Sequence, residues 1–177
     1  MNRKEFLKTS GIGLGFALVP GIVLGKTTST TSSGKPKIIK DGQGEVLNVI
    51  GDLQTHKLVG TETEGQITEW VDDVEPGTGI PPHVHTQEDE IFRVVKGEVE
   101  IRVGDSTTVL KAGDVAFAPK NIPHAWKVVG TEKARMITSA FPSGIEDMFQ
   151  ELAVLPAGPP DLVKVSDICR KYGIRFI

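Results

Sequence analysis

The sequence predicts an all-β domain followed by a short helical end, and three observations favour it. Residues 98–103, Glu-Val-Glu-Ile-Arg-Val, alternate polar and apolar side chains without a break, as a half-buried strand does. Further β-rich runs follow at short intervals, and the 20 glycines and 11 prolines of this 177-residue chain suit the turns between them. Helical spacing of apolar residues enters only near the C-terminus.

The alternating run at 98–103 ends at Gly104-Asp105, which predicts a turn into the next strand. Runs before and after it complete a set of about nine or ten strands. The clearest of these other runs are 46–50, 55–59, 66–74, 107–110, 126–129 and 134–141.

Two helices are expected after residue 142. Ser143 and Glu146 have the spacing of a capping box, and the first helix should stop before Pro156. Its apolar residues at helical spacing are Ile145, Met148, Phe149 and Leu152. Asp161 is a candidate N-cap for a second helix that runs to about Tyr172, where Gly173 would close it. We expect this tail to pack on the barrel.

Two histidines and a glutamate show a pattern typical of a divalent-metal site. Side chains at i and i+2 of a strand point the same way, so His83 and His85 can converge on one ion. The prolines at 81–82 favour the extended backbone that this requires. A turn over 86–89 would return Glu90 to the two histidines.

A third histidine stands in a second cluster. Residues 113–126 read as a strand that ends at Pro119, a tight turn at Lys120 and Asn121, and a new strand near His124. Nitrogen and oxygen ligands of this kind suit borderline metals, so four ligands from three segments would close a site.

Glycines flank both clusters at fixed spacing. The first cluster reads Gly77, five residues, His83-Val84-His85, four residues, Glu90, six residues and Gly97; the second reads Gly113, five residues, Pro119, and then His124. These patterns resemble the two motifs of the cupin superfamily. From about residue 45 onward the chain is similar to small single-domain (cupin type 2) proteins that are often called quercetin-dioxygenase-like.

Two positions depart from the second motif: Asn121 stands where glycine is usual, and Val128 where asparagine is frequent. Asparagine tolerates a left-handed turn better than other non-glycine residues, so the turn survives the first change. Position 128 is not a metal ligand in the motif.

The resemblance implies a jelly-roll β-barrel that holds a His3Glu metal centre. The implied ligands are His83, His85, Glu90 and His124, and the implied cofactor is one divalent transition metal: Mn, Fe, Ni, Co, Cu or Zn. By the same resemblance, Glu90 also accepts a substrate proton, and the protein pairs as a homodimer.

The chain divides into four segments. Residues 1–25 are expected to be a signal peptide, because basic residues precede a short apolar stretch that glycines and Pro20 interrupt. The segment Arg3-Lys4-Glu5-Phe6-Leu7-Lys8 also resembles a twin-arginine signal, with Lys4 in place of the second arginine. Residues 26–44 should be a flexible lead, residues 45–142 the barrel, and residues 143–177 a helical extension packed on it.

The signal predicts export to the periplasm or the extracellular space, with no stable membrane insertion after cleavage. The alternative is a protein anchored in the membrane by an uncleaved N-terminal segment. The formal net charge is −3, and no basic patch suggests a nucleic-acid partner, so we expect a small-molecule substrate.

Three functions fit such a site. The first is a metal-dependent dioxygenase-like oxidoreductase acting on a small aromatic or enolisable substrate. The second is a metal-dependent isomerase, epimerase or lyase, which needs Lewis acidity without redox change. The third is a non-catalytic cupin that binds a small molecule.

Other polar residues have plainer interpretations. His56 is expected to be a surface or core residue with a satisfied hydrogen bond, and Glu88 and Asp89 a solvated acidic turn. Four residues are candidates for the wall of the substrate pocket: Phe92, Phe117, Trp126 and Met136.

Overall fold

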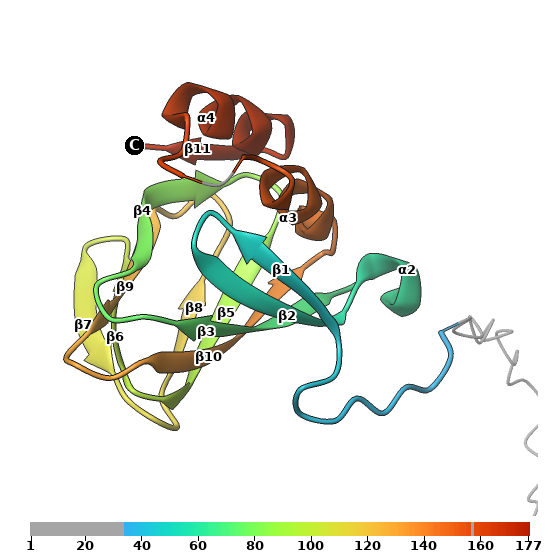
Figure 1. Ribbon diagram of the computed structural model, residues 1–177, viewed down its shortest axis with the longest axis horizontal. Coiled ribbons are helices and arrows are strands. Elements are labelled where there is room, and N and C mark those ends of the chain that lie inside the picture. Colours follow the sequence, from blue (N-terminus) through green and yellow to red (C-terminus); the bar gives the residue numbers. More distant parts are fainter. Residues whose placement is uncertain (1–33, 157) are drawn as a thin grey trace, which may run out of the picture. The chain divides into compact units, whose positions relative to one another are not determined.

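The computed structural model describes residues 34–156 and 158–177, and these contain eleven strands and three helices (Figure 1). In chain order, the strands up to the second motif are β1 (Glu45–Val49), β2 (Asp52–Leu58), β3 (Thr68–Val74), β4 (Gly79–His85), β5 (Asp89–Lys96), β6 (Glu98–Val103) and β7 (Ser106–Leu110). The later strands are β8 (Val115–Ala118), β9 (His124–Val129), β10 (Ala134–Phe141) and β11 (Ile174–Phe176). The helices are α2 (Gly60–Thr63), α3 (Ile145–Ala153) and α4 (Leu162–Lys171).

The strands form two antiparallel sheets. One has the order β1-β2-β3-β10-β5-β8, and the other has the order β11-β4-β9-β6-β7. Sequence neighbours are often separated in these orders, as β4 and β5 are, so the chain crosses repeatedly between the two sheets. This is the double-sheet jelly-roll arrangement, and the prediction of an all-β barrel with short C-terminal helices is confirmed.

Strand alternation directs one set of side chains into the barrel. Along β10 buried residues alternate with partly exposed ones, and its buried set is Ala134, Met136, Thr138 and Ala140. These residues face the space between the sheets, as the period of two requires. A hydrophobic cluster that includes Val94, Val99 and Val128 fills one part of this space.

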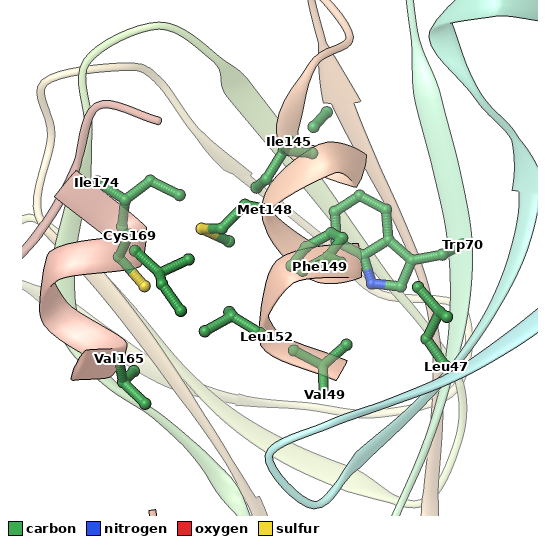
Figure 2. Packing of buried hydrophobic residues seen from close by; sticks show 12 residues of the cluster. Leu47, Val49, Trp70, Ile145, Met148, Phe149, Leu152, Val165, Cys169 and Ile174 are labelled. Atoms are coloured by element: carbon green, nitrogen blue, oxygen red, sulfur yellow. The ribbon is translucent and has the colours of Figure 1, made fainter. Parts of the chain in front are cut away.

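Helices α3 and α4 lie side by side at one end of the barrel, near β1 and β11 (Figure 1). Their apolar faces form a second hydrophobic cluster together with strand residues (Figure 2). The labelled members are Leu47, Val49, Trp70, Ile145, Met148, Phe149, Leu152, Val165, Cys169 and Ile174. The expected packing of the C-terminal extension on the barrel therefore follows from the burial of these two helix faces.

The capping of α4 agrees with the sequence prediction, whereas that of α3 does not. The Asp161 carboxylate accepts from the N–H groups of Val163 and Lys164, at 3.0 and 3.2 Å. At α3, however, the N-cap residue is Gly144 at φ 136° rather than Ser143, and a glycine has no side chain to cap the helix. The capping box predicted at Ser143 is therefore wrong.

Glu146 has a different role from the one its spacing suggested. Its carboxylate accepts hydrogen bonds from the N–H groups of Gly60 and Gly144, both at 2.7 Å, and from the Thr68 hydroxyl. It thus ties α3 to α2 and β3. Two of these donors, Gly60 and Thr68, are distant in sequence, and the capping-box pattern did not predict them.

The turn between β8 and β9 has the predicted backbone. Asn121 adopts φ 65°, the left-handed conformation in which the motif usually has glycine. Its N–H donates to the carbonyl of His85 at 2.7 Å, so this turn is joined to the end of β4.

Two elements were not predicted: the single helical turn α2 and the last strand, β11. Strand β11 pairs with β4, so that Ile174 lies opposite His85 and Phe176 opposite His83. A three-residue strand carries too little periodicity to be recognised before its partner is known.

The predicted signal peptide and the start of the predicted lead lie outside the described residues. Residues 34–44 contain neither strand nor helix, and Ile38 is 92% exposed. Among the helices that the structure describes, none has the length and apolar character needed to cross a membrane.

Candidate metal centre

The structure brings the four predicted ligands together inside the barrel. His83 and His85 lie near the end of β4, and His124 begins β9, directly opposite His83 in the register of the sheet. Glu90 comes from β5 in the other sheet. One ligand atom from each of the four lies within 4.8 Å of the others, and all four side chains are buried.

The backbone orients two of the imidazoles. Nδ1 of His83 lies 2.9 Å from the Pro81 carbonyl, and Nδ1 of His124 lies 3.1 Å from the Ile122 carbonyl. A carbonyl oxygen can only accept, so each Nδ1 carries a proton and donates it. Nε2 of His83 is then left with a free lone pair, which is the state that binds a metal, whereas Nε2 of His124 faces the Glu90 carboxylate.

Glu90 is held as an anion. Its Oε2 lies 2.9 Å from Nε2 of His124 and 3.6 Å from Nε2 of His85. Burial by itself would raise the pKa of this carboxyl, but the charge of His85 and the hydrogen bond from His124 outweigh burial and lower its pKa to about 2.

The histidines respond to the same neighbours in opposite ways. Burial, followed by repulsion from His124 and His85, lowers the pKa of His83 to about 4, so its ring is neutral at physiological pH. For His85 burial acts in the same direction, but the carboxylates of Glu90 and Glu88 prevail and raise its pKa.

Glu88 corrects one prediction from the sequence. Its side chain is 3% exposed, and its Oε2 lies 3.6 Å from Nδ1 of His85. It is therefore a buried neighbour of the site rather than part of a solvated turn. Asp89 is partly exposed and accepts from the Lys120 N–H at 2.7 Å.

The donor set and its geometry fit a divalent transition metal. Two ligand atoms that each lie about 2.1 Å from one ion are at most about 4.2 Å apart, so small side-chain shifts would close the cluster around it. Three imidazoles and one carboxylate suit several metals of the first transition series, and nothing in the donor set selects one. The Nδ1–H donors to backbone carbonyls supply the supporting hydrogen bonds that such sites require.

The cluster opens into a cavity of about 440 Å³. Three of the four ligands line it: His83, His85 and Glu90. Much of the wall comes from the C-terminal extension, with α3, α4 and β11 all contributing apolar side chains. The volume lies within the range of small-molecule sites, roughly 300–1,000 Å³.

Two of the four predicted pocket residues line this cavity, and two do not. Phe92 and Trp126 are part of its wall. Phe117 is 51% exposed on β8, where its ring stacks on Phe141 at a centroid distance of 6.4 Å. Met136 is fully buried in the hydrophobic cluster with Val94 and Val99, away from the cavity wall. Whether one of these residues lines the cavity depends on the strand face it occupies and on its distance from the site, and it cannot be inferred from residue type alone.

His56 is a core residue, as expected. It is 4% exposed, stacks on Trp70 at 6.2 Å, and its Nε2 lies 3.2 Å from Oε1 of Gln54. The expected hydrogen bond is therefore present on Nε2, whereas Nδ1 has no hydrogen-bond partner among the described residues.

Sequence analysis missed four further polar residues on the cavity wall. They are Asp52, Gln54, Asp72 and Thr138, each no more than 4% exposed. One signal was present in the sequence: Asp52, Gln54 and His56 alternate at i, i+2 and i+4, which places three polar side chains on one strand face.

Comparison with known proteins agrees with this fold and site. Residues 70–140 match the family model described as a cupin domain. A cupin domain over these residues, which include both motifs' metal-ligand positions, agrees with the resemblance that the two motifs predicted.

The chain is also similar to curated proteins over most of its length. Oxalate oxidase 2 of Hordeum vulgare is 29% identical over 134 residues, which are 70% of this chain and 59% of that protein. Quercetin 2,3-dioxygenase of Bacillus subtilis (strain 168) is 24% identical over 131 residues, which are 73% of this chain and 38% of that protein. The chain thus spans less than two thirds of the length of these relatives.

Among solved structures, KdgF from Halomonas sp. superposes with a TM-score of 0.57 at 18% identity, over 64% of this chain and 99% of that one. An RmlC-like cupin from Shewanella frigidimarina NCIMB 400 gives a TM-score of 0.55 at 18% identity, over 64% and 96%. Both likenesses concern the fold.

Proposed function

We propose that this protein is a metal-dependent dioxygenase-like oxidoreductase that acts on a small aromatic or enolisable substrate. The observation that carries the proposal is the His3Glu cluster at the wall of a largely apolar cavity. Oxalate oxidase 2 and quercetin 2,3-dioxygenase, both oxidoreductases by name, are similar to this chain and support it.

The roles of the residues follow from their contacts. His83, His85 and His124 would hold the metal through Nε2, and Glu90 through its carboxylate. A bound redox-active divalent metal would acidify a coordinated substrate hydroxyl and exchange electrons with dioxygen. The apolar walls, Phe92 and Trp126 among them, would orient the substrate and exclude water.

Glu90 is the group that would receive the substrate proton. It is ionised throughout the neutral range because its pKa is about 2. Such a low pKa also makes it a weak base, so it takes a proton only from a hydroxyl that is itself strongly acidified.

Oxygen consumption tests the proposal. Protein loaded separately with Mn, Fe, Co, Ni or Cu is mixed with flavonols, enediols and thiols, and zinc-loaded protein serves as the redox-inert control. We expect substrate-dependent oxygen uptake with at least one metal, and a loss of at least about 100-fold in His85→Ala, the scale on which removing one essential group acts.

Three outcomes would contradict the proposal. Absence of uptake with every redox metal would exclude dioxygenase chemistry on these substrates. Full turnover with zinc under anaerobic conditions would instead select an isomerase, epimerase or lyase. Tight ligand binding without turnover would leave a binding protein.

We also propose, from the sequence, that the protein is exported and forms a homodimer. Exposed apolar side chains on the six-stranded sheet, such as Leu53, Val95 and Phe117, support a contact between copies. Sedimentation of the protein and fractionation of cells expressing the full chain would test the two points separately.

A further inference from the structure

The cavity has a second polar wall besides the metal-binding cluster. Asp52 and Gln54 come from β2, Asp72 from β3 and Thr138 from β10, and all four line the same cavity as His83, His85 and Glu90. We call these four residues the carboxyl cluster. Each is at least nine-tenths buried, although a barrel interior ordinarily favours apolar side chains there.

Hydrogen bonds occupy most of the acceptor atoms in the carboxyl cluster. Oδ1 of Asp72 accepts from Nε1 of Trp70 at 2.7 Å, and its Oδ2 accepts from the Thr138 hydroxyl at 2.6 Å. Oδ2 of Asp52 accepts from Nε2 of Gln54 at 2.8 Å. Oδ1 of Asp52 is the exception, because no donor reaches it in the described structure.

The two carboxyl groups also influence each other's ionisation. Burial is the main reason why the pKa of each is raised, and for Asp72 the adjacent Asp52 adds to it. No lysine or arginine is among the described residues that line the cavity. A negative charge left on the pair can therefore be stabilised only by hydrogen-bond donors, and Asp52 lacks one on Oδ1.

Strand register places this cluster at a distance from the metal-binding residues. On β10, Ala140 lies opposite Glu90 of β5, whereas Met136 lies opposite Asp72 of β3. Four residues along a strand correspond to roughly 13 Å. Thr138 lies between these two levels and pairs with Phe92 on one side and Trp70 on the other.

The space between the two polar walls is bordered by apolar side chains. Trp70 and Phe92 contribute from the strands, and Ile145, Met148 and Phe149 from α3. A ligand that reaches both walls would therefore be apolar in its middle, polar at both ends, and about two aromatic rings long.

We propose that the Asp52–Asp72 pair is a second recognition point of this cavity and accepts a hydrogen bond from a ligand hydroxyl opposite the metal-binding end. The inference rests on the proposed function in so far as it places the substrate in this cavity. The second recognition point specifies the substrate class: an aromatic molecule with a metal-binding oxygen at one end and a hydroxyl at the other. A hydroxyl suits the pair better than an ammonium group, because burial disfavours the full negative charge that would have to balance a buried cation.

Binding to zinc-loaded protein without oxygen tests this inference apart from any redox chemistry. Three probes share a catechol end: 4-phenylcatechol, 4-(4-hydroxyphenyl)catechol and 4-(4-aminomethylphenyl)catechol. Calorimetry should give at least about tenfold tighter binding of the hydroxyl probe than of the phenyl probe, as expected for a hydrogen bond to a charged group. In Asp52→Asn, which keeps the side-chain shape, this preference should fall to about threefold or less, because a neutral acceptor bonds more weakly.

The matched control is Asp73→Asn. Asp73 is the next residue on β3, is partly exposed, does not line the cavity and forms a 3.8 Å ion pair with Arg135, so the control should keep the full preference. Equal binding of the phenyl and hydroxyl probes to the wild type, or an unchanged preference in Asp52→Asn, would overturn the inference. Failure of all three probes to bind would also overturn it, and tightest binding of the aminomethyl probe would replace the hydroxyl with a cation.

The two experiments can fail independently. A hydroxyl preference that depends on Asp52, found without oxygen uptake under any condition, would retain the recognition point and refute the oxidoreductase. Oxygen uptake without a preference for the hydroxyl probe would retain the oxidoreductase and refute the recognition point.

Discussion

The two polar clusters inside the barrel are equally buried, yet they hold their carboxyl groups in opposite states. Glu90 lies among three imidazoles, and its pKa falls to about 2. Asp72 lies beside a second carboxyl group, and its pKa is raised well above the usual range. Burial opposes ionisation at both sites, so the neighbours decide the outcome.

Because of this contrast, the two clusters should bind different kinds of group. The first presents an anion and neutral nitrogen lone pairs, which are ligands for a cation. The second has two carboxyl groups whose pKa values are raised and an acceptor without a donor, which suits a neutral hydrogen-bond donor. A substrate that spans the cavity would meet both kinds of surface.

Removal of a metal ligand should produce the largest effect. His124→Ala deletes a buried imidazole that has no substitute within the cluster, and we expect metal affinity to fall by more than about 100-fold, beyond the range typical of residues that only support a ligand. Competition with a chromophoric chelator measures the loss. The control His56→Gln alters the histidine outside the cluster and should leave affinity unchanged. Retention of affinity within tenfold in His124→Ala would refute the four-ligand assignment.

Glu88 should have the next largest effect. Its carboxylate faces Nδ1 of His85 at 3.6 Å, so Glu88→Gln should weaken the orientation of that ring and lower metal affinity about 10–100-fold. The same chelator titration applies. Asp89→Asn, at the adjacent but more exposed position, keeps an acceptor for the Lys120 N–H and should bind metal normally. Equal affinities of the two variants would mean that Glu88 does not act through His85.

The smallest effect should be a change in the pH dependence of stability in Asp72→Asn. Below about pH 4 this carboxyl is protonated in both the folded and the unfolded chain. As the pH rises, the unfolded chain ionises first because the folded-state pKa is raised, so the wild type loses stability until the pH passes the folded-state value.

The asparagine variant lacks this loss. We compare the free energy of unfolding of the variant with that of the wild type at each pH. From pH 4 to pH 8 this difference should change in favour of the variant by on the order of 1 kcal/mol, the ordinary scale of a single-site change. Denaturant titrations of the metal-free proteins at several pH values would show it. Parallel pH profiles for the two proteins would contradict the raised pKa of Asp72.

Much of this fold could be predicted from the sequence because its signals are local. The run at 98–103 became β6, and Asp161 caps α4 through its own side chain. The His-x-His spacing placed two imidazoles on one strand face, and Asn121 has the left-handed turn that its position required. Each of these features depends on residues only a few positions apart.

The features that were missed depend on distant contacts. Glu146 accepts from Gly60 and Thr68 as well as from Gly144 at the start of its own helix, and Glu88 is buried against His85 although it sits in an acidic run. Phe117 and Met136 were chosen by residue type, but one faces outward and the other lies in a separate hydrophobic cluster. Strand β11 needs β4 to be recognised at all.

By itself the sequence determined the strand periodicity, the two motifs, the four candidate ligands and the helical tail, because spacing along one chain dictates which side chains share a face. Only the tertiary structure decided that the tail lines the cavity, that Glu88 lies beside His85, and that Asp52 and Asp72 line the same cavity as the metal-binding cluster. The reason is that the pKa and the binding role of a buried group depend on neighbours that the fold brings from other strands. In this barrel, the neighbours of Glu90 lower its pKa and keep it ionised for a metal, whereas the surroundings of Asp72 raise its pKa and favour the protonated form.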